Sequence, residues 1–64
     1  MSKTGLLKLK TLITLTANRA GLTTEELSVK INENYIQTLA MLIQMSDENE
    51  VEYVENDGKW VVVF

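Results

Sequence analysis

The segment from Leu22 to Met45 contains two short helical patterns joined by a polar turn, and it constrains the fold more than any other stretch. Thr23 followed three residues later by Glu26 is the signature of a capping box at a helix start. A helix is therefore expected from about Thr24 to Ile31. Its core-facing residues are Leu27 and Ile31, which lie one turn apart.

The turn that follows consists of Asn32, Glu33 and Asn34, whose side chains favour turns and caps over helix interiors. Asn34 is expected to cap a further helix that runs to about Met45 or Ser46. Leu39 lies at the middle of the broadest apolar arc, which is expected to face the core and consists of Tyr35, Ile36, Leu39, Leu42 and Ile43. The opposite arc is expected to face solvent and holds Gln37, Thr38, Met41 and Gln44, with Asn34 and Met45 at its margins.

A third helical pattern precedes this segment, from Thr4 to Asn18. Apolar residues recur there at three- and four-residue steps and predict one buried stripe, widened by Leu12, that consists of Leu6, Leu9, Ile13 and Ala17. Leu7 and Leu15 fall among the polar residues of the other side. Two interpretations stay open for them: scattered surface leucines, or a subunit contact.

A hairpin pattern closes the chain. Val51–Glu55 and Lys59–Phe64 are rich in β-forming residues and flank Asp57-Gly58, a strong signal for a two-residue turn. That turn predicts the pairs Glu55–Trp60, Tyr53–Val62 and Val51–Phe64. One face, expected to cover the helices, carries Val51, Tyr53, Trp60, Val62 and Phe64. The other carries Glu52, Val54, Val61 and Val63, and its valines are expected to mark a dimer interface or a partner surface.

The order of these parts predicts an α+β fold: a winged helix-turn-helix with three helices followed by a C-terminal β-hairpin wing, as a single domain over residues 1–64. A chain of 64 residues has a small core, and without cysteine or histidine it has neither disulfides nor the usual metal ligands. Association into a homodimer is one way to gain stability. Its interface, through Leu7 and Leu15, through Val61 and Val63, or through neither, is left open.

Several function classes are not expected. Without histidine or cysteine, and with its three glycines far apart, the chain offers no nucleophile, base or phosphate loop typical of an enzyme. No cofactor, metal or membrane partner is expected. Lys3, Lys8 and Lys10 interrupt the leucine-rich start before a signal peptide or membrane span can form, so a cytoplasmic location is expected.

The pattern resembles the winged helix-turn-helix superfamily of small bacterial, archaeal and phage regulators. The resemblance covers nearly the whole chain and is carried by Leu6, Leu9 and Ile13, the run from Ala17 to Leu27, Leu42, Met45, and the hairpin from Val51 to Phe64. It implies a regulator of transcription that binds double-stranded DNA with its third helix in the major groove. Carried over by position, the base-reading residues are Asn34, Gln37, Thr38 and Met41, with Lys30 and Lys59 on phosphate.

The charge distribution departs from that family pattern. Helix three contains no Lys or Arg, and between Asp47 and Lys59 the acidic residues stand against a single base. Cations supply most non-specific affinity for DNA, so an acidic wing repels the phosphates. The net charge of −3 points the same way. The alternative is an acidic winged-helix module that binds protein, as an adaptor, anti-repressor or inhibitor of a host nucleic-acid machine.

Overall fold

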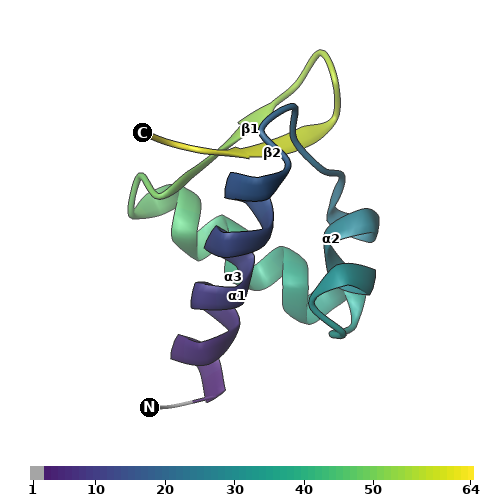
Figure 1. Ribbon diagram of the computed structural model, residues 1–64, viewed down its shortest axis with the longest axis vertical. Coiled ribbons are helices and arrows are strands. Elements are labelled where there is room, and N and C mark those ends of the chain that lie inside the picture. The colour runs from purple at the N-terminus through teal and green to yellow at the C-terminus, as the bar shows by residue number, and fades with distance from the viewer. Residues whose placement is uncertain (1–2) are drawn as a thin grey trace.

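Three helices and a β-hairpin follow one another along the chain. The computed structural model describes residues 3–64, the side chain of Thr4 excepted. Its elements are α1 (Lys3–Ala17), α2 (Thr24–Lys30), α3 (Tyr35–Asp47), β1 (Val51–Val54) and β2 (Lys59–Val62). The hairpin lies at one end of the molecule and the N-terminal end of α1 at the other (Figure 1). This is the winged-helix arrangement that the sequence predicts.

α2 and α3 both begin at the predicted caps. The Thr23 hydroxyl accepts the Glu26 N–H at 3.1 Å while the Glu26 carboxylate accepts the Thr23 N–H at 2.9 Å, so the capping box at α2 is complete. At α3 the Asn34 Oδ1 accepts the Gln37 N–H at 2.8 Å. These bonds satisfy backbone donors that a helix start leaves without partners.

The two helices also end alike. Asn32 follows α2 with φ 57°, and Asn49 follows α3 with φ 61°, the left-handed conformation that asparagine tolerates. In each case the next residue donates its N–H back into the last turn, Glu33 to the Ser28 carbonyl and Glu50 to the Met45 carbonyl, both at 2.9 Å. This is the Schellman pattern, which turns the chain sharply out of the helix.

The hairpin is joined by a third short piece of chain. Leu22 and Trp60 exchange N–H···O bonds of 3.1 and 2.7 Å, so the segment before α2 pairs with the outer edge of β2. Gly21 permits this approach: its φ is 99°, and a Cβ there would lie 3.0 Å from the Trp60 carbonyl oxygen. Trp60 also donates its indole N–H to the Thr24 hydroxyl at 2.9 Å, which fixes α2 against the sheet.

The predicted hairpin register was wrong by two residues. The observed pairs are Val51–Val62, Glu52–Val61, Tyr53–Trp60 and Val54–Lys59, because a four-residue loop, residues 55–58, replaces the two-residue turn. A two-residue shift leaves every side chain on its predicted face. Val51 and Trp60 are accordingly buried, but Tyr53 is 46% and Phe64 81% exposed, so these two do not cover the helices as predicted.

The core lies where α1, α2, α3 and the hairpin meet, and its helical contributions differ from the prediction. Leu27 of α2 and Ile31 at its C-cap are buried as predicted. α1 turns Thr11 and Leu15 inward, and α3 buries Leu42 as predicted but turns most of the rest of its predicted core arc away from the core. The buried residues of α3 are Thr38, Met41, Leu42 and Met45, whereas Tyr35, Ile36 and Ile43 are exposed and Leu39 is half-buried.

Two threonines explain how a nominally polar side comes to face inward. The Thr11 hydroxyl donates to the Leu7 carbonyl and the Thr38 hydroxyl donates to the Asn34 carbonyl, both at 2.8 Å and both one turn back in the same helix. A hydroxyl satisfied in this way no longer needs water. Thr11 and Thr38 therefore pack as small β-branched residues. In α3 the predicted solvent arc is divided, because Thr38 and Met41 are buried while Gln37 and Gln44 stay exposed.

Candidate functional site

The outward side of α3 is apolar. Because Thr38, Met41 and Met45 face the core, the residues half a turn away are left at the surface. Ile36 and Ile43 are 77% and 51% exposed. Together with the exposed Ala40 and the half-buried Leu39 they form what we call the α3 face, defined as Ile36, Leu39, Ala40 and Ile43.

A shallow hollow borders the α3 face on the side of α1. It has a volume of about 170 Å³ and is lined by Leu7, Gln37, Ala40, Met41 and Gln44. Leu7, Ala40 and Met41 make its walls apolar, while the two glutamine amides stand seven residues apart along α3. The hollow therefore adds hydrogen-bonding groups beside an apolar surface, a combination that suits a protein ligand.

Two of the four predicted base-reading residues are buried in the structure. Thr38 is fully buried and Met41 is 8% exposed, so neither reaches a ligand placed outside α3. The prediction was wrong because it treated threonine as a solvent-facing residue. Asn34 and Gln37 stay exposed, but the Asn34 Oδ1 is engaged by the Gln37 backbone N–H as the helix cap.

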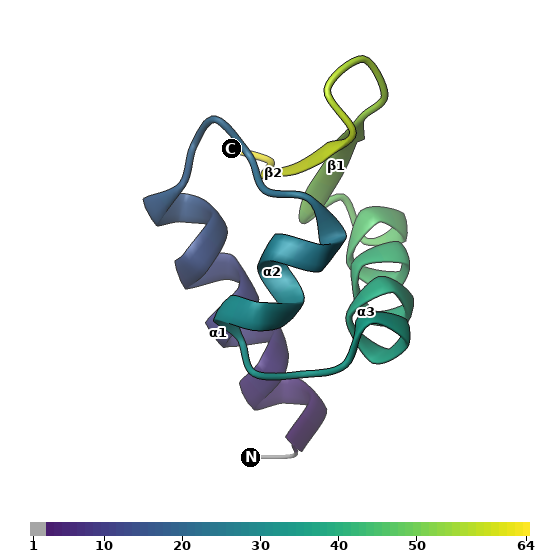
Figure 2. The same cartoon turned by 90° about the vertical axis from the view of Figure 1, so that its right-hand side faces the viewer.

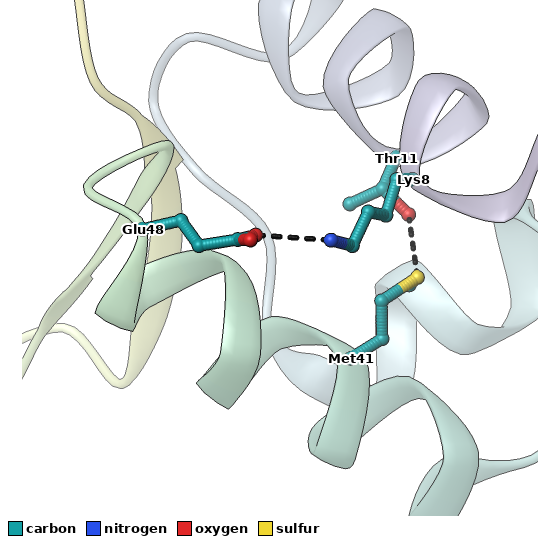
Figure 3. A network of polar contacts seen from close by, with 4 residues as sticks. All are labelled: Lys8, Thr11, Met41 and Glu48. Carbon is teal, nitrogen blue, oxygen red and sulfur yellow. Dashed lines mark hydrogen bonds and ion pairs between the residues drawn. The ribbon is translucent and has the colours of Figure 1, made fainter. Parts of the chain in front are cut away.

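Two of the described cations are engaged in contacts within the domain. Lys8 of α1 forms an ion pair with Glu48 just after α3, Nζ to Oε1 at 2.9 Å (Figure 3). In the same view the Thr11 hydroxyl lies 3.8 Å from the Met41 sulfur, so these contacts hold α1 against α3. Arg19 stacks over the Phe64 ring, with its guanidinium carbon 4.3 Å from the ring centroid.

The two lysines predicted to contact phosphate lie beside α2. Lys30 ends α2 and Lys59 begins β2, and both positive charges help to lower the pKa of the Glu26 carboxyl. The largest cause of that lowered pKa is the hydrogen bond from the Thr23 backbone N–H. Lys30 also borders an open hollow of about 360 Å³ along α2, which it shares with Thr23, Glu25, Glu26 and Val29. These lysines therefore flank α2.

Carboxylates surround the end of α3. Asp47 and Glu48 are exposed, and Glu50 follows them. The pKa of Glu48 is lowered, first because Lys8 donates a hydrogen bond to its carboxylate and then through a side-chain hydrogen bond with Glu50. Further along, the wing adds Glu52, Glu55 and Asp57, all exposed. The α3 face thus borders a negatively charged region.

The residues proposed for a dimer interface are partly used inside the domain. Leu15 is fully buried, so it is neither a surface leucine nor a subunit contact, whereas Leu7 is half-buried, packs against the core and also lines the hollow beside α3. Val61 is half-buried, with a methyl group 3.0 Å from the position that a Gly21 Cβ would take. Val63 is 43% exposed and stays available at the surface.

The stripe expected in the core lies outside on α1. Leu6, Leu9 and Ile13 are each 45% or more exposed, and we call these three residues the α1 stripe. Ala17, expected to extend it inward, is also exposed. The signal that marks the true inner side is the four-residue spacing of Leu7, Thr11 and Leu15, which becomes visible only when threonine is accepted as a core residue.

A scan against protein-family models found no match for this chain, and searches of curated proteins and of solved structures found no relative. Among residues 3–64, no helix has both the length and the apolar character needed to cross a bilayer. In the same residues no cluster of three or more Asp, Glu, His or Cys side chains is arranged to hold a metal ion. The surface chemistry of the domain therefore carries the functional inference.

Proposed function

We propose that this winged-helix domain is a protein-interaction module that binds its partner through the α3 face. The observation that carries the proposal is the composition of that face: Ile36 and Ile43 project into solvent, and α3 contains no Lys or Arg. Exposed apolar side chains gathered on one helix face are typical of protein docking surfaces.

The charges around the α3 face specify the partner's chemistry. Asp47, Glu48 and Glu50 border it, so a complementary surface has an apolar centre and a rim of Lys or Arg. A basic groove that normally holds nucleic acid has this character. An adaptor or inhibitor of a nucleic-acid machine is thus the class of role that fits, in the cytoplasmic setting expected from the sequence.

DNA recognition by α3 has less support. Phosphate binding depends on cations, and of the candidate cations Lys8 is paired with Glu48 while Lys30 and Lys59 flank α2. The major-groove role of Asn34 and Gln37 stays a prediction. A fluorescence titration with mixed duplex DNA at low salt tests it, and saturable binding at tens of micromolar or below, lost in Gln37→Ala, would overturn the protein-binding proposal.

The direct test compares matched surface variants. The doubly substituted Ile36→Gln/Ile43→Gln domain removes the apolar centre without adding charge, and Val29→Gln alters an equally exposed apolar residue on α2. We expect wild type and Val29→Gln to bind the same stoichiometric protein partner in affinity capture, and the double variant to lose it. The purified partner should then bind more weakly as salt rises, because its basic rim faces acids. Equal capture by all three proteins would refute the assignment of the α3 face.

A further inference from the structure

We propose that copies of this chain associate head to tail, with the α1 stripe of one copy packed on the α3 face of the next. The inference rests on the proposed function in one respect, because it uses the same α3 face. It adds a specific occupant: a second copy of this chain. The partner surface needed by α3, apolar with a basic rim, is present on α1 itself.

The two faces match in length and spacing. The α1 stripe runs over eight residues, from Leu6 to Ile13, and the α3 face also runs over eight residues, from Ile36 to Ile43. At about 1.5 Å rise per residue, both span roughly 10 Å. Antiparallel packing brings every apolar residue of one stripe opposite an apolar residue of the other. The resulting pairs are Leu6 with Ile43, Leu9 with Leu39 and Ala40, and Ile13 with Ile36.

The charges at the ends of the two helices also favour antiparallel packing of α1 on α3. Lys3 lies one turn before Leu6, and Asp47 lies one turn after Ile43, so antiparallel packing places them together. It also sets the positive N-terminal end of α1 against the negative C-terminal end of α3.

Charge segregation along the chain makes the alternatives less favourable. The first acidic residue is Glu25, so α1 carries only lysines, whereas all nine acids lie from Glu25 onward. A contact between two α1 stripes has lysines on both sides and no acid of α1 to pair with them, and a contact between two α3 faces has carboxylates and no Lys or Arg of α3 to pair with them. Like charges at a contact disfavour it, so the unlike faces are the complementary pair.

The two faces belong to different sides of the domain. In Figure 2, α1 and α3 stand on either side of α2, and each packs on the core with the side opposite to its exposed apolar residues. One copy thus offers both halves of the contact at once. A contact between unlike faces that does not close into a ring extends as a chain of copies.

The contact is expected to be weak. The whole domain exposes 4257 Å², and a standard interface of about 800 Å² per partner would take roughly a fifth of that area. A single helix pair buries less. We therefore expect association at protein concentrations on the order of 100 µM to 1 mM, seen by sedimentation velocity as species that grow with concentration.

Two blocked variants separate this arrangement from a symmetric dimer. Leu9→Gln/Ile13→Gln disables the α1 stripe and Ile36→Gln/Ile43→Gln disables the α3 face, all at exposed positions that leave the core intact. Each variant alone should sediment as a monomer, and their equimolar mixture should give a discrete dimer that grows no further. Circular dichroism verifies that both variants are folded, and Val29→Gln should associate like wild type.

Charge reversal tests the direction of packing. Lys3→Glu should weaken association by about two- to fivefold, as expected for one exposed ion pair, and mixing a Lys3→Glu copy with an Asp47→Lys copy should recover it. Dimers that persist in either blocked variant alone, or a wild type that is monomeric at 1 mM, would overturn the proposal. If self-association fails, the proposed function can still be tested separately, because capture of a different protein by the α3 face does not require the α1 stripe.

Discussion

α2 and α3 begin and end in the same way, but the sequence predicts the buried residues of α2 better than those of α3. Each begins at a side-chain cap, Thr23 or Asn34, and each ends at an asparagine in the left-handed conformation. α2 buries the face that its sequence predicts, formed by Leu27 and Ile31. α3 buries Leu42 as predicted, but together with Met41 and Met45 in place of Ile36 and Ile43.

The difference shows what a sequence pattern specifies and what it leaves open. α2 offers only one apolar pair for burial, Leu27 and Ile31, which lie one turn apart. Its other large apolar residue, Val29, has no apolar neighbour one turn away in the helix and is 75% exposed. α3 has apolar residues on nearly every side, so two arcs compete for the core. The positions of α1 and the hairpin decide between them. A helix with apolar residues on both sides leaves some of them at the surface, and in α3 these residues form the α3 face.

The largest expected loss of stability comes from the buried side of α3, and the exposed side should contribute little. Leu42→Ala removes a fully buried side chain and should lower the free energy of unfolding by about 2–5 kcal/mol, a large share of the stability of so small a domain. Its neighbour Ile43 is exposed, so Ile43→Ala should change stability by less than about 0.5 kcal/mol. Urea denaturation measures both, and similar losses from the two variants would break the comparison.

The junction before α2 should be the next most sensitive point. Gly21→Ala forces a Cβ to within 3.0 Å of the Trp60 carbonyl at a φ of 99°, and should cost about 1–3 kcal/mol. Gly58→Ala is the matched control, since its φ is 64° but its nearest contact is an ordinary 3.7 Å to the Tyr53 hydroxyl. Thermal denaturation should rank Gly21→Ala as the more damaging variant. The reverse order would mean that the close approach of Gly21 to β2 is not what requires glycine at this position.

The helix caps test whether the two helix starts are equivalent. Thr23→Ala and Asn34→Ala each remove one side-chain acceptor from a helix N-terminus, and each should cost about 1 kcal/mol. Thr23→Ser and Asn34→Asp retain an acceptor and should restore most of the loss. Chemical denaturation of the four variants provides the comparison. A neutral Asn34→Ala would indicate that tertiary packing, and not the cap, sets the start of α3.

The smallest effect concerns pH. The pKa of Glu26 is lowered from its ordinary value of 4.5, chiefly by the Thr23 backbone hydrogen bond, so the ionised carboxylate favours the folded state. That contribution is present above pH 4.5 and is lost as the pH falls through the lowered pKa. Glu26→Gln keeps the capping geometry and should show a shallower fall in Tm below pH 4.5. Glu55→Gln, on the hairpin loop, controls for the loss of one negative charge, and a slope equal to that of wild type in Glu26→Gln would contradict the assignment.

Local chemistry in the sequence determined the order of the elements, the helix starts at Thr23 and Asn34, and the left-handed turn at Asn49. It determined which hairpin side chains share a face, because strand alternation survives a two-residue change of register. These features depend on residues within a few positions of one another. For that reason they were predictable without knowing where the rest of the chain lies.

Only the tertiary structure decided which sides of α1 and α3 face inward. Leu15 and Leu42 are buried while Ile13 and Ile43 are not, although each pair is equally apolar. Each helix carries two apolar stripes, and the core has room for one. The choice depends on helices and strands distant in sequence, and on threonine hydroxyls that find partners within their own helix. The candidate interaction surface is the stripe left outside, so it could be located only after the inner one was known.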